Sequence, residues 1–160
     1  MIYQFYQRHI FPHLLNQVMQ TASLMDRRRE LLLPLEGEVL EIGFGTGLNI
    51  PFYGNVDSVY ALEPNPDIYQ LAVERVQHAP FFIKHVQSSA EKLPFADASL
   101  DHIVSTWTLC SIADLEQALA EIHRVLKPTG TFHLVEHVKH PNSTKIQSLQ
   151  TLLTPIRSEE

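Results

Sequence analysis

The alternation of apolar and polar positions divides the chain into a helical start and a core of strands and helices. Between residues 3 and 28, apolar side chains recur at helical spacing, as at Leu14, Val18, Ala22 and Met25. From Val39 onward, short apolar runs typical of buried strands alternate with helical patterns. We expect strands at 39–42, 59–62, 81–86, 102–106 and 131–136, and helices at 67–77 and 115–127. This order predicts an α/β fold whose parallel strands are joined by crossover helices.

The domain organisation follows from length and from where these patterns stop. A chain of 160 residues is expected to form one domain. We expect an N-terminal helical cap in residues 1–30, a core in residues 36–140 and a short tail in residues 141–160. In the tail only residues 146–153 have the pattern of a further short helix, so a sixth or seventh strand is not expected.

Composition and charge narrow the classes of partner. Apolar residues make up 44% of the chain, which is enough for one buried core, and the net charge is −6. An acidic chain argues against a nucleic-acid partner held by phosphate contacts. The only basic cluster, residues 27–29, is expected to end a helix, complement its dipole and face solvent. No run is long and apolar enough to predict a membrane span.

Cysteine and histidine usage add two further expectations. A single cysteine, Cys110, forbids an intrachain disulfide and fits a reducing, cytoplasmic compartment. We expect Cys110 to be a packed thiol rather than a nucleophile. The nine histidines show no ligand spacing beside a cysteine pair or a carboxylate motif, so no metal site is expected.

The glycine-rich run after the first strand carries the clearest chemistry. Val39 to Gly47 reads Val-Leu-Glu-Ile-Gly-Phe-Gly-Thr-Gly, an apolar strand with a charge, Glu41, near its end. Glycines at such a bend allow positive φ and leave the backbone bare for a ligand, and we expect a helix to follow whose first turn offers unpaired N–H groups. The dinucleotide fingerprint Gly-x-Gly-x-x-Gly is not matched, because Leu48 stands where its third glycine would fall. The alternative is a turn whose glycines serve packing alone.

Further candidate contacts lie where the second and fourth strands end. Glu63, followed by Pro64, is expected to accept hydrogen bonds from the two vicinal hydroxyls of a ribose. Thr106 and Trp107 leave the fourth strand at the same edge and are expected to line the ligand crevice. Trp107 as plain buried packing is the alternative.

These segments together resemble the class I S-adenosylmethionine (SAM) dependent methyltransferases of the type 11 group, which includes the ubiquinone and menaquinone C-methyltransferases. The run Asn49 to Tyr53, the run Thr108 to Ser111 and the triplet Val135-Glu136-His137 resemble more closely small bacterial members related to the animal thiol methyltransferases. The resemblance implies a Rossmann-like three-layer sandwich with a mostly parallel sheet. It also implies SAM as cofactor and S-adenosylhomocysteine as product.

The resemblance assigns roles to individual residues. It places Glu41 beneath the methionine end of the cofactor, and it places a small residue and an acid beside the adenine in the segment Ser89-Ala90-Glu91. Glu91 as an ordinary surface residue is the alternative. The full set of expected cofactor-binding residues is Glu41, Gly43, Phe44, Gly45, Gly47, Asn49, Glu63, Pro64, Ser89, Ala90, Glu91, Thr106 and Trp107.

The sequence departs from the family pattern after the fifth strand. The family sheet has seven strands, and the last two, which help to shape the acceptor pocket, are not expected here. The fifth strand would then expose unpaired backbone groups at its outer edge. We expect residues 141–156 to cover this edge, or two chains to pair there as a homodimer.

Three functions are compatible with these patterns to different degrees. The first is a SAM-dependent methyltransferase acting on a small thiol, quinol-like or lipid-like acceptor. The second is a SAM-binding module that is catalytically incomplete because the C-terminal substrate region is missing. The third, an NAD-dependent oxidoreductase, is disfavoured by Leu48 and Glu41. A catalytic residue is not assigned; Glu136 and His137 are candidate bases, with closure of the strand as the alternative role.

Overall fold

Five parallel strands form the central sheet. The computed structural model describes residues 19–136. Its strands are β1 (Glu36–Ile42), β2 (Asn55–Leu62), β3 (Phe82–Val86), β4 (Leu100–Thr106) and β5 (Leu126–Val135), in the spatial order β3-β2-β1-β4-β5. Every neighbouring pair is parallel. The predicted α/β fold with a Rossmann-like parallel sheet is therefore confirmed.

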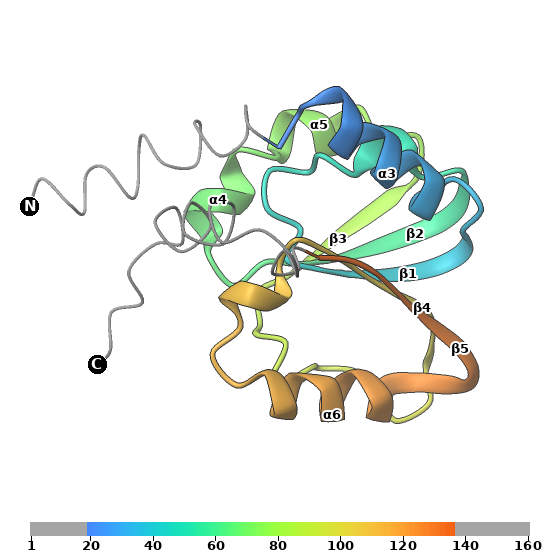
Figure 1. Ribbon diagram of the computed structural model, residues 1–160, viewed down its shortest axis with the longest axis vertical. Coiled ribbons are helices and arrows are strands. Elements are labelled where there is room, and N and C mark those ends of the chain that lie inside the picture. Colours follow the sequence, from blue (N-terminus) through green and yellow to red (C-terminus); the bar gives the residue numbers. More distant parts are fainter. Residues whose placement is uncertain (1–18, 137–160) are drawn as a thin grey trace, which may run out of the picture.

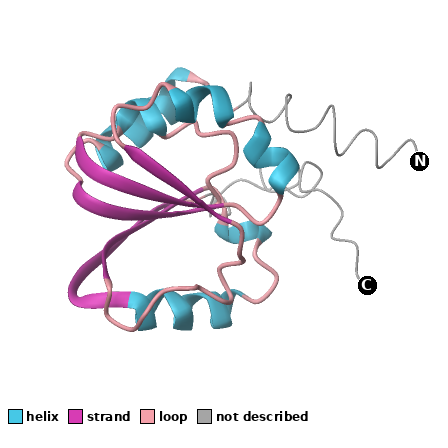
Figure 2. Ribbon diagram, turned by 180° about the vertical axis from the view of Figure 1, so that it is seen from behind, coloured by secondary structure: helices cyan, strands magenta, loops and turns pink. Residues whose placement is uncertain are grey.

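Helices on both faces of the sheet produce three layers. Helices α3 (Ala22–Leu32) and α5 (Val73–Gln77) lie over one face, and α6 (Leu115–Val125) lies over the other (Figure 1). The same arrangement is seen from behind in Figure 2, where the strands run between the helical layers. A short helix, α4 (Pro66–Gln70), precedes α5. Each space between sheet and helices is filled by its own cluster of buried apolar side chains.

The central strand β1 is buried on both sides, as expected for a parallel strand between two helical layers. Val39 belongs to the apolar cluster on the α3 side, whereas Leu40 and Ile42 belong to the cluster on the α6 side. Successive side chains of a strand point to opposite faces. Glu41 therefore points to the same face as Val39, which places a carboxylate under α3.

Two predicted helix boundaries need correction. The helix expected at 67–77 is divided into α4 and α5, because the amides of Leu71 and Ala72 bond three residues back, to Ile68 and Tyr69, instead of four. The helix expected to end at residue 28 continues to Leu32 as α3, and its predicted part before residue 19 lies outside the described residues. The three arginines at 27–29 therefore lie within the helix and do not end it.

The last strand begins earlier than predicted. Helix α6 ends at Val125, and β5 starts at once with Leu126, although we expected the helix to reach 127 and the strand to start at 131. The register of β5 against β4 shifts between Leu100 and His102, which leaves extra residues of β5 around Pro128. Such an irregularity suits a proline, which has no N–H to give to the ladder.

At its outer edge β5 has no strand partner among residues 19–136, where it pairs with β4 alone. The predicted tail, including the cover by residues 141–156, lies outside the described residues, so those predictions and the division into cap, core and tail stay predictions. No helix within the described part of the chain is long and apolar enough to cross a membrane.

Candidate functional site

The glycine turn lies where β1 ends, at the carboxyl edge of the sheet. Gly43, Gly45 and Gly47 have φ of 70°, 58° and 75°, a region that favours glycine. The turn is fixed from below, because the amides of Gly43 and Phe44 both donate to the carbonyl oxygen of Leu62 at the end of β2, at 3.0 and 3.1 Å. The predicted bare turn is therefore present, and its conformation requires glycine.

The space around two of these glycines differs. A Cβ built on Gly43 would lie 2.2 Å from the Cγ2 of Thr108, so a side chain is excluded there. A Cβ on Gly45 would meet only the carbonyl oxygen of Gly43, at 3.8 Å. Gly45 therefore presents open backbone, which a ligand can approach.

The expected helix after the turn is not formed. The chain continues into a short 3₁₀ turn, η1 (Ile50–Phe52), so the prediction that a helix N-terminus offers free N–H groups is wrong. Pro51 lacks an N–H, and the side chain of Asn49 is committed to buried partners. The turn is instead held by Arg75 of α5, whose Nη1 donates to the carbonyl oxygen of Thr46 at 2.7 Å.

Glu41 is the centre of a buried polar network. Its side chain is 1% exposed, and its two oxygens accept hydrogen bonds from Asn49 Nδ2 at 2.8 Å and from the Tyr53 hydroxyl at 2.7 Å. Burial raises the pKa of Glu41 to about 7, although both hydrogen bonds and the positive charge of Arg28 favour its ionised form. Because a buried acid with a pKa near neutrality costs stability, its position at the end of β1 suggests a functional role.

Arg28 joins this network from α3, and the prediction that it faces solvent is wrong. Its guanidinium is buried, and Nη1 donates to Asn49 Oδ1 and, at 3.0 Å, to Thr106 Oγ1. Burial lowers its pKa, while Glu41 and Tyr53 act in the opposite direction. The neighbouring arginines at 27 and 29 are exposed, as predicted, and pair with acids of the same helix.

A signal for Arg28 was present in the sequence. It stands three residues after Met25 and four before Leu32, which is the spacing of one helix face. Met25 packs against the apolar cluster on the α3 side and Leu32 belongs to it. An arginine within an apolar stripe was therefore the clue to a buried cation.

Glu63 lies beside the glycine turn, as predicted. Its side chain is 6% exposed; Oε2 accepts from the amide of Gly45 at 3.1 Å and Oε1 from the amide of Asn65 at 3.0 Å. Burial raises its pKa, and the two backbone hydrogen bonds act against the rise. Each carboxylate oxygen has a second lone pair for a further donor. Pro64, which follows, is exposed.

The segment after β3 lies on the α6 side of the sheet. Ala90 is buried in the apolar cluster of that side, and Ser89 is exposed. The carboxylate of Glu91 accepts from the amide of Asp114, just before α6, at 3.3 Å. Glu91 is thus held by the loop that starts α6, and Ser89 also hydrogen-bonds to it.

The last residue of β4 and the residue that follows it border the edge from the other side. Thr106 is 7% exposed and accepts from Arg28 and, at 3.1 Å, from Asn49 Nδ2. Trp107 has φ of 55°, and its ring lies 4.8 Å from the guanidinium carbon of Arg28. Such a stacking of a cation on an indole ring is favourable. Trp107 is therefore part of the edge and is only partly buried.

Glu136 reaches the same edge from β5, whereas His137 lies outside the described residues. Among the predicted site residues, hydrogen bonds link Glu41, Asn49 and Thr106 into one group. They also link Gly45 with Glu63, Phe44 with Gly47, and Ser89 with Glu91. Within residues 19–136 no group of three or more histidine, cysteine or acidic side chains could hold a metal ion.

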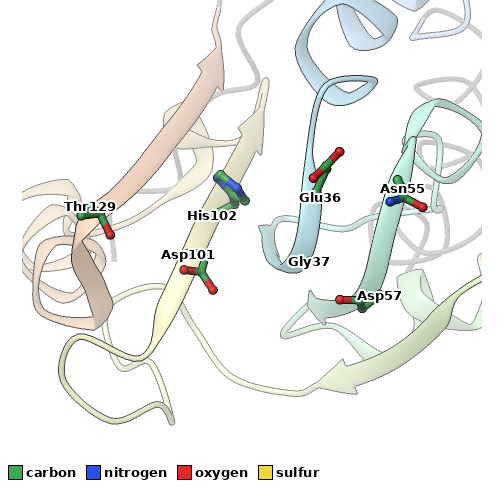
Figure 3. Close-up of a pocket in the computed structure, with 7 residues that line it drawn as sticks. All are labelled: Glu36, Gly37, Asn55, Asp57, Asp101, His102 and Thr129. Atoms are coloured by element: carbon green, nitrogen blue, oxygen red, sulfur yellow. The ribbon is translucent and has the colours of Figure 1, made fainter.

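A cavity of about 460 Å³ opens at the opposite end of the sheet (Figure 3). It is lined by residues at or near the starts of β1, β2 and β4 and by part of β5: Glu36, Gly37, Asn55, Asp57, Asp101, His102 and Thr129. In open α/β sheets, ligands bind at the carboxyl ends of the strands. We therefore place the candidate site at the glycine turn and not in this acidic cavity.

Comparison with known proteins identifies the family of the domain. The family described as "Methyltransferase domain" matches residues 40–134. The human thiol S-methyltransferase TMT1A is 32% identical over 158 residues, covering 91% of this chain and 65% of that protein. The ubiquinone/menaquinone biosynthesis C-methyltransferase UbiE of Klebsiella pneumoniae is 33% identical over 107 residues, covering 63% of this chain and 43% of that protein.

Solved structures give the same fold. The YcgJ protein of Bacillus subtilis has a TM-score of 0.60 at 28% identity, covering 75% of this chain and 51% of that one. A SAM-dependent methyltransferase of Aquifex aeolicus has a TM-score of 0.66 at 22% identity, covering 81% and 74%. The chain spans less than two thirds of the length of the thiol methyltransferases that it matches. The chain belongs to the family described as "Methyltransferase domain".

Proposed function

We propose that this chain binds SAM over its glycine turn and transfers the methyl group to a small thiol. The observation that carries the proposal is the pair of buried acids, Glu41 and Glu63, at the ends of two neighbouring strands with open glycine backbone between them. The names of the thiol S-methyltransferase relatives support a thiol, and the UbiE relatives support a quinol-like compound as the second acceptor class.

The residues of the edge fit the cofactor in chemical terms. Vicinal ribose hydroxyls are two donors, and the carboxylate of Glu63 has free lone pairs beside those that bind Gly45 and Asn65. The methionine end of SAM carries one ammonium and one carboxylate group. Glu41 and Arg28, in one network, offer an opposite charge to each of them. We assign the adenine to the segment from Ser89 to Glu91, in keeping with the family resemblance.

The protein's part in the reaction is mainly positioning. When bound, the cofactor supplies a methyl group on a positively charged sulfur. The glycine turn and Glu63 hold that molecule in place, and the loop from Trp107 onward forms a wall toward the acceptor. The thiol reacts as its thiolate, after its proton has passed to solvent. Alignment of the thiolate sulfur with the methyl donor, with water excluded, then lowers the barrier without an acid catalyst.

Transfer of a labelled methyl group from SAM to a panel of thiols and quinols tests the proposal. We expect methylated thiol with the wild type, and much less of it with a Glu63→Ala variant when SAM is not saturating. Binding of the cofactor without transfer to any compound of the panel would favour the SAM-binding module instead. Absence of SAM binding would refute both the methyltransferase and the SAM-binding module.

We further propose that two copies pair through the outer edge of β5. The strand has only β4 as a partner among residues 19–136, and Leu134 on it is 47% exposed. Unpaired strand edges favour such pairing. Sedimentation is expected to show a dimer, and a monomer at all concentrations would contradict this. The reducing, cytoplasmic compartment and the lack of a nucleic-acid partner remain predictions from composition.

A further inference from the structure

One carboxylate holds the loop that follows β4. Glu136 comes directly after β5, and its Oε1 accepts hydrogen bonds from two successive backbone amides, those of Thr108 at 2.9 Å and Leu109 at 3.0 Å. The same oxygen accepts from the hydroxyl of Ser105 at 3.2 Å. Three donors on one oxygen, two of them from the loop backbone, fix the position of the loop relative to β5.

The loop needs such support because its first residue is strained. Trp107 has φ of 55°, which is rare for a bulky residue because its side chain crowds the backbone. Its amide donates to the carbonyl oxygen of Val135 at 2.7 Å. A strained conformation persists only where its surroundings fix it, and here β5 and Glu136 do so from one side.

The loop in turn shapes the candidate site. Thr108 packs so closely against Gly43 that no side chain fits between them. The centre of the Trp107 ring lies 4.8 Å from the guanidinium carbon of Arg28, and Arg28 donates a hydrogen bond to Asn49 in the buried network. Figure 1 shows this segment between β4 and α6 at the end of the sheet where β1 finishes. Glu136 is therefore connected to the cofactor edge through Trp107 and Thr108.

We propose that Glu136 is a positioning residue that presents Trp107 and Thr108 to the edge of the sheet where the glycine turn lies. This inference rests on the proposed function, since it takes that edge as the SAM site. The Oε1 of Glu136 accepts three hydrogen bonds, and the two from successive amides place the backbone of Thr108 and Leu109 relative to β5.

Two substitutions of Glu136 distinguish the position of its accepting oxygen from the charge of its side chain. Glu136→Gln keeps an oxygen at the same distance and removes the charge, whereas Glu136→Asp keeps the charge and withdraws it from the loop. Trp107 is the single tryptophan, so its emission reports on this loop directly. Glu121→Asp is the matched control, because Glu121 also accepts from a loop amide, that of Leu93 at 2.8 Å, in a different loop.

The first readout is tryptophan emission without ligand, and the second is the Kd for S-adenosylhomocysteine by calorimetry. We expect Glu136→Gln to keep the wild-type emission and Kd. Glu136→Asp should shift the emission and raise the Kd about tenfold, because binding must then order the loop. The Glu121 control should leave the emission unchanged.

The reverse pattern would overturn the proposal: normal emission in Glu136→Asp, or an altered emission in Glu136→Gln. Loss of methyl transfer in Glu136→Gln with normal emission and Kd would identify a base and overturn it as well. If Glu136→Asp does not fold, the emission of Glu136→Gln still decides. A wild type that fails to bind S-adenosylhomocysteine would refute the proposed function, while the emission comparison would still test the positioning of the loop.

Discussion

Replacing Glu41 by glutamine should stabilise the protein at high pH, because the native carboxylate is ionised at a cost. Glu41 is 1% exposed, and burial raises its pKa from 4.5 to about 7. The native state therefore holds this proton more tightly than the unfolded state does. The free energy of unfolding contributed by Glu41 is fully present below pH 4.5 and is lost as the pH rises through about 7.

The magnitude follows from the size of the pKa change. A pKa raised from 4.5 to about 7 corresponds to about 3 kcal/mol of folding free energy, most of which is lost between pH 5 and pH 8. Glutamine has nearly the same shape as protonated glutamic acid and does not titrate. Between pH 5 and pH 8, the free energy of unfolding of Glu41→Gln should therefore rise relative to that of the wild type by about 2 to 3 kcal/mol.

Urea unfolding followed by circular dichroism at a series of pH values measures this difference. Glu38→Gln is the matched control, because Glu38 lies on the same strand and is exposed. The control should differ from the wild type by only a small amount, because its side chain is exposed. A difference for Glu41→Gln that is independent of pH, or that moves in favour of the wild type as the pH rises, would refute the account of the buried network.

Three further substitutions test single contacts. Gly43→Ala places a Cβ 2.2 Å from Thr108 at positive φ and should cost about 2 to 4 kcal/mol in urea unfolding; an unchanged midpoint would show that the turn relaxes freely. Glu63→Ala should raise the Kd for S-adenosylhomocysteine about 30-fold, and an unchanged Kd would remove Glu63 from the ribose site. Arg28→Met should lower the unfolding free energy by about 3 kcal/mol and change the emission of Trp107; wild-type values of both would contradict the buried role.

The sheet could be predicted because its strands are apolar on both faces. Val39, Leu40 and Ile42 are buried between two helical layers, and such an apolar run is typical of a central strand in a parallel sheet. The position of Glu41 and Glu63 at the same edge of the sheet also follows from the sequence, since the carboxyl ends of parallel strands share an edge.

Other features depend on contacts that the sequence pattern does not contain. Burial of Arg28 arises because the network beneath α3 offers acceptors on β4 and on the glycine turn. The 3₁₀ turn at Ile50 replaces the expected helix because Asn49 is drawn inward to Glu41. The register shift of β5 near Pro128 depends on its pairing with β4. Each is a tertiary effect that overrides a local preference.

Two glycines, one at the start of β1 and one beyond its end, allow a direct test of the proposed cofactor site. Gly37 and Gly45 have φ of 72° and 58°, and a Cβ on either would meet little or nothing nearby. Alanine should therefore strain the backbone similarly at both, by about 1 to 2 kcal/mol. Gly37 lies at the start of β1, away from the edge where Gly45 donates to Glu63.

Calorimetric titration of S-adenosylhomocysteine into the wild type, Gly37→Ala and Gly45→Ala is the most direct measurement. We expect one site per chain in the wild type and the same affinity in Gly37→Ala. The affinity of Gly45→Ala should be about tenfold weaker or more, because its Cβ occupies the ligand's approach to the backbone. Absence of binding to the wild type at millimolar ligand, or an equal loss of affinity in both variants, would contradict the proposed cofactor site.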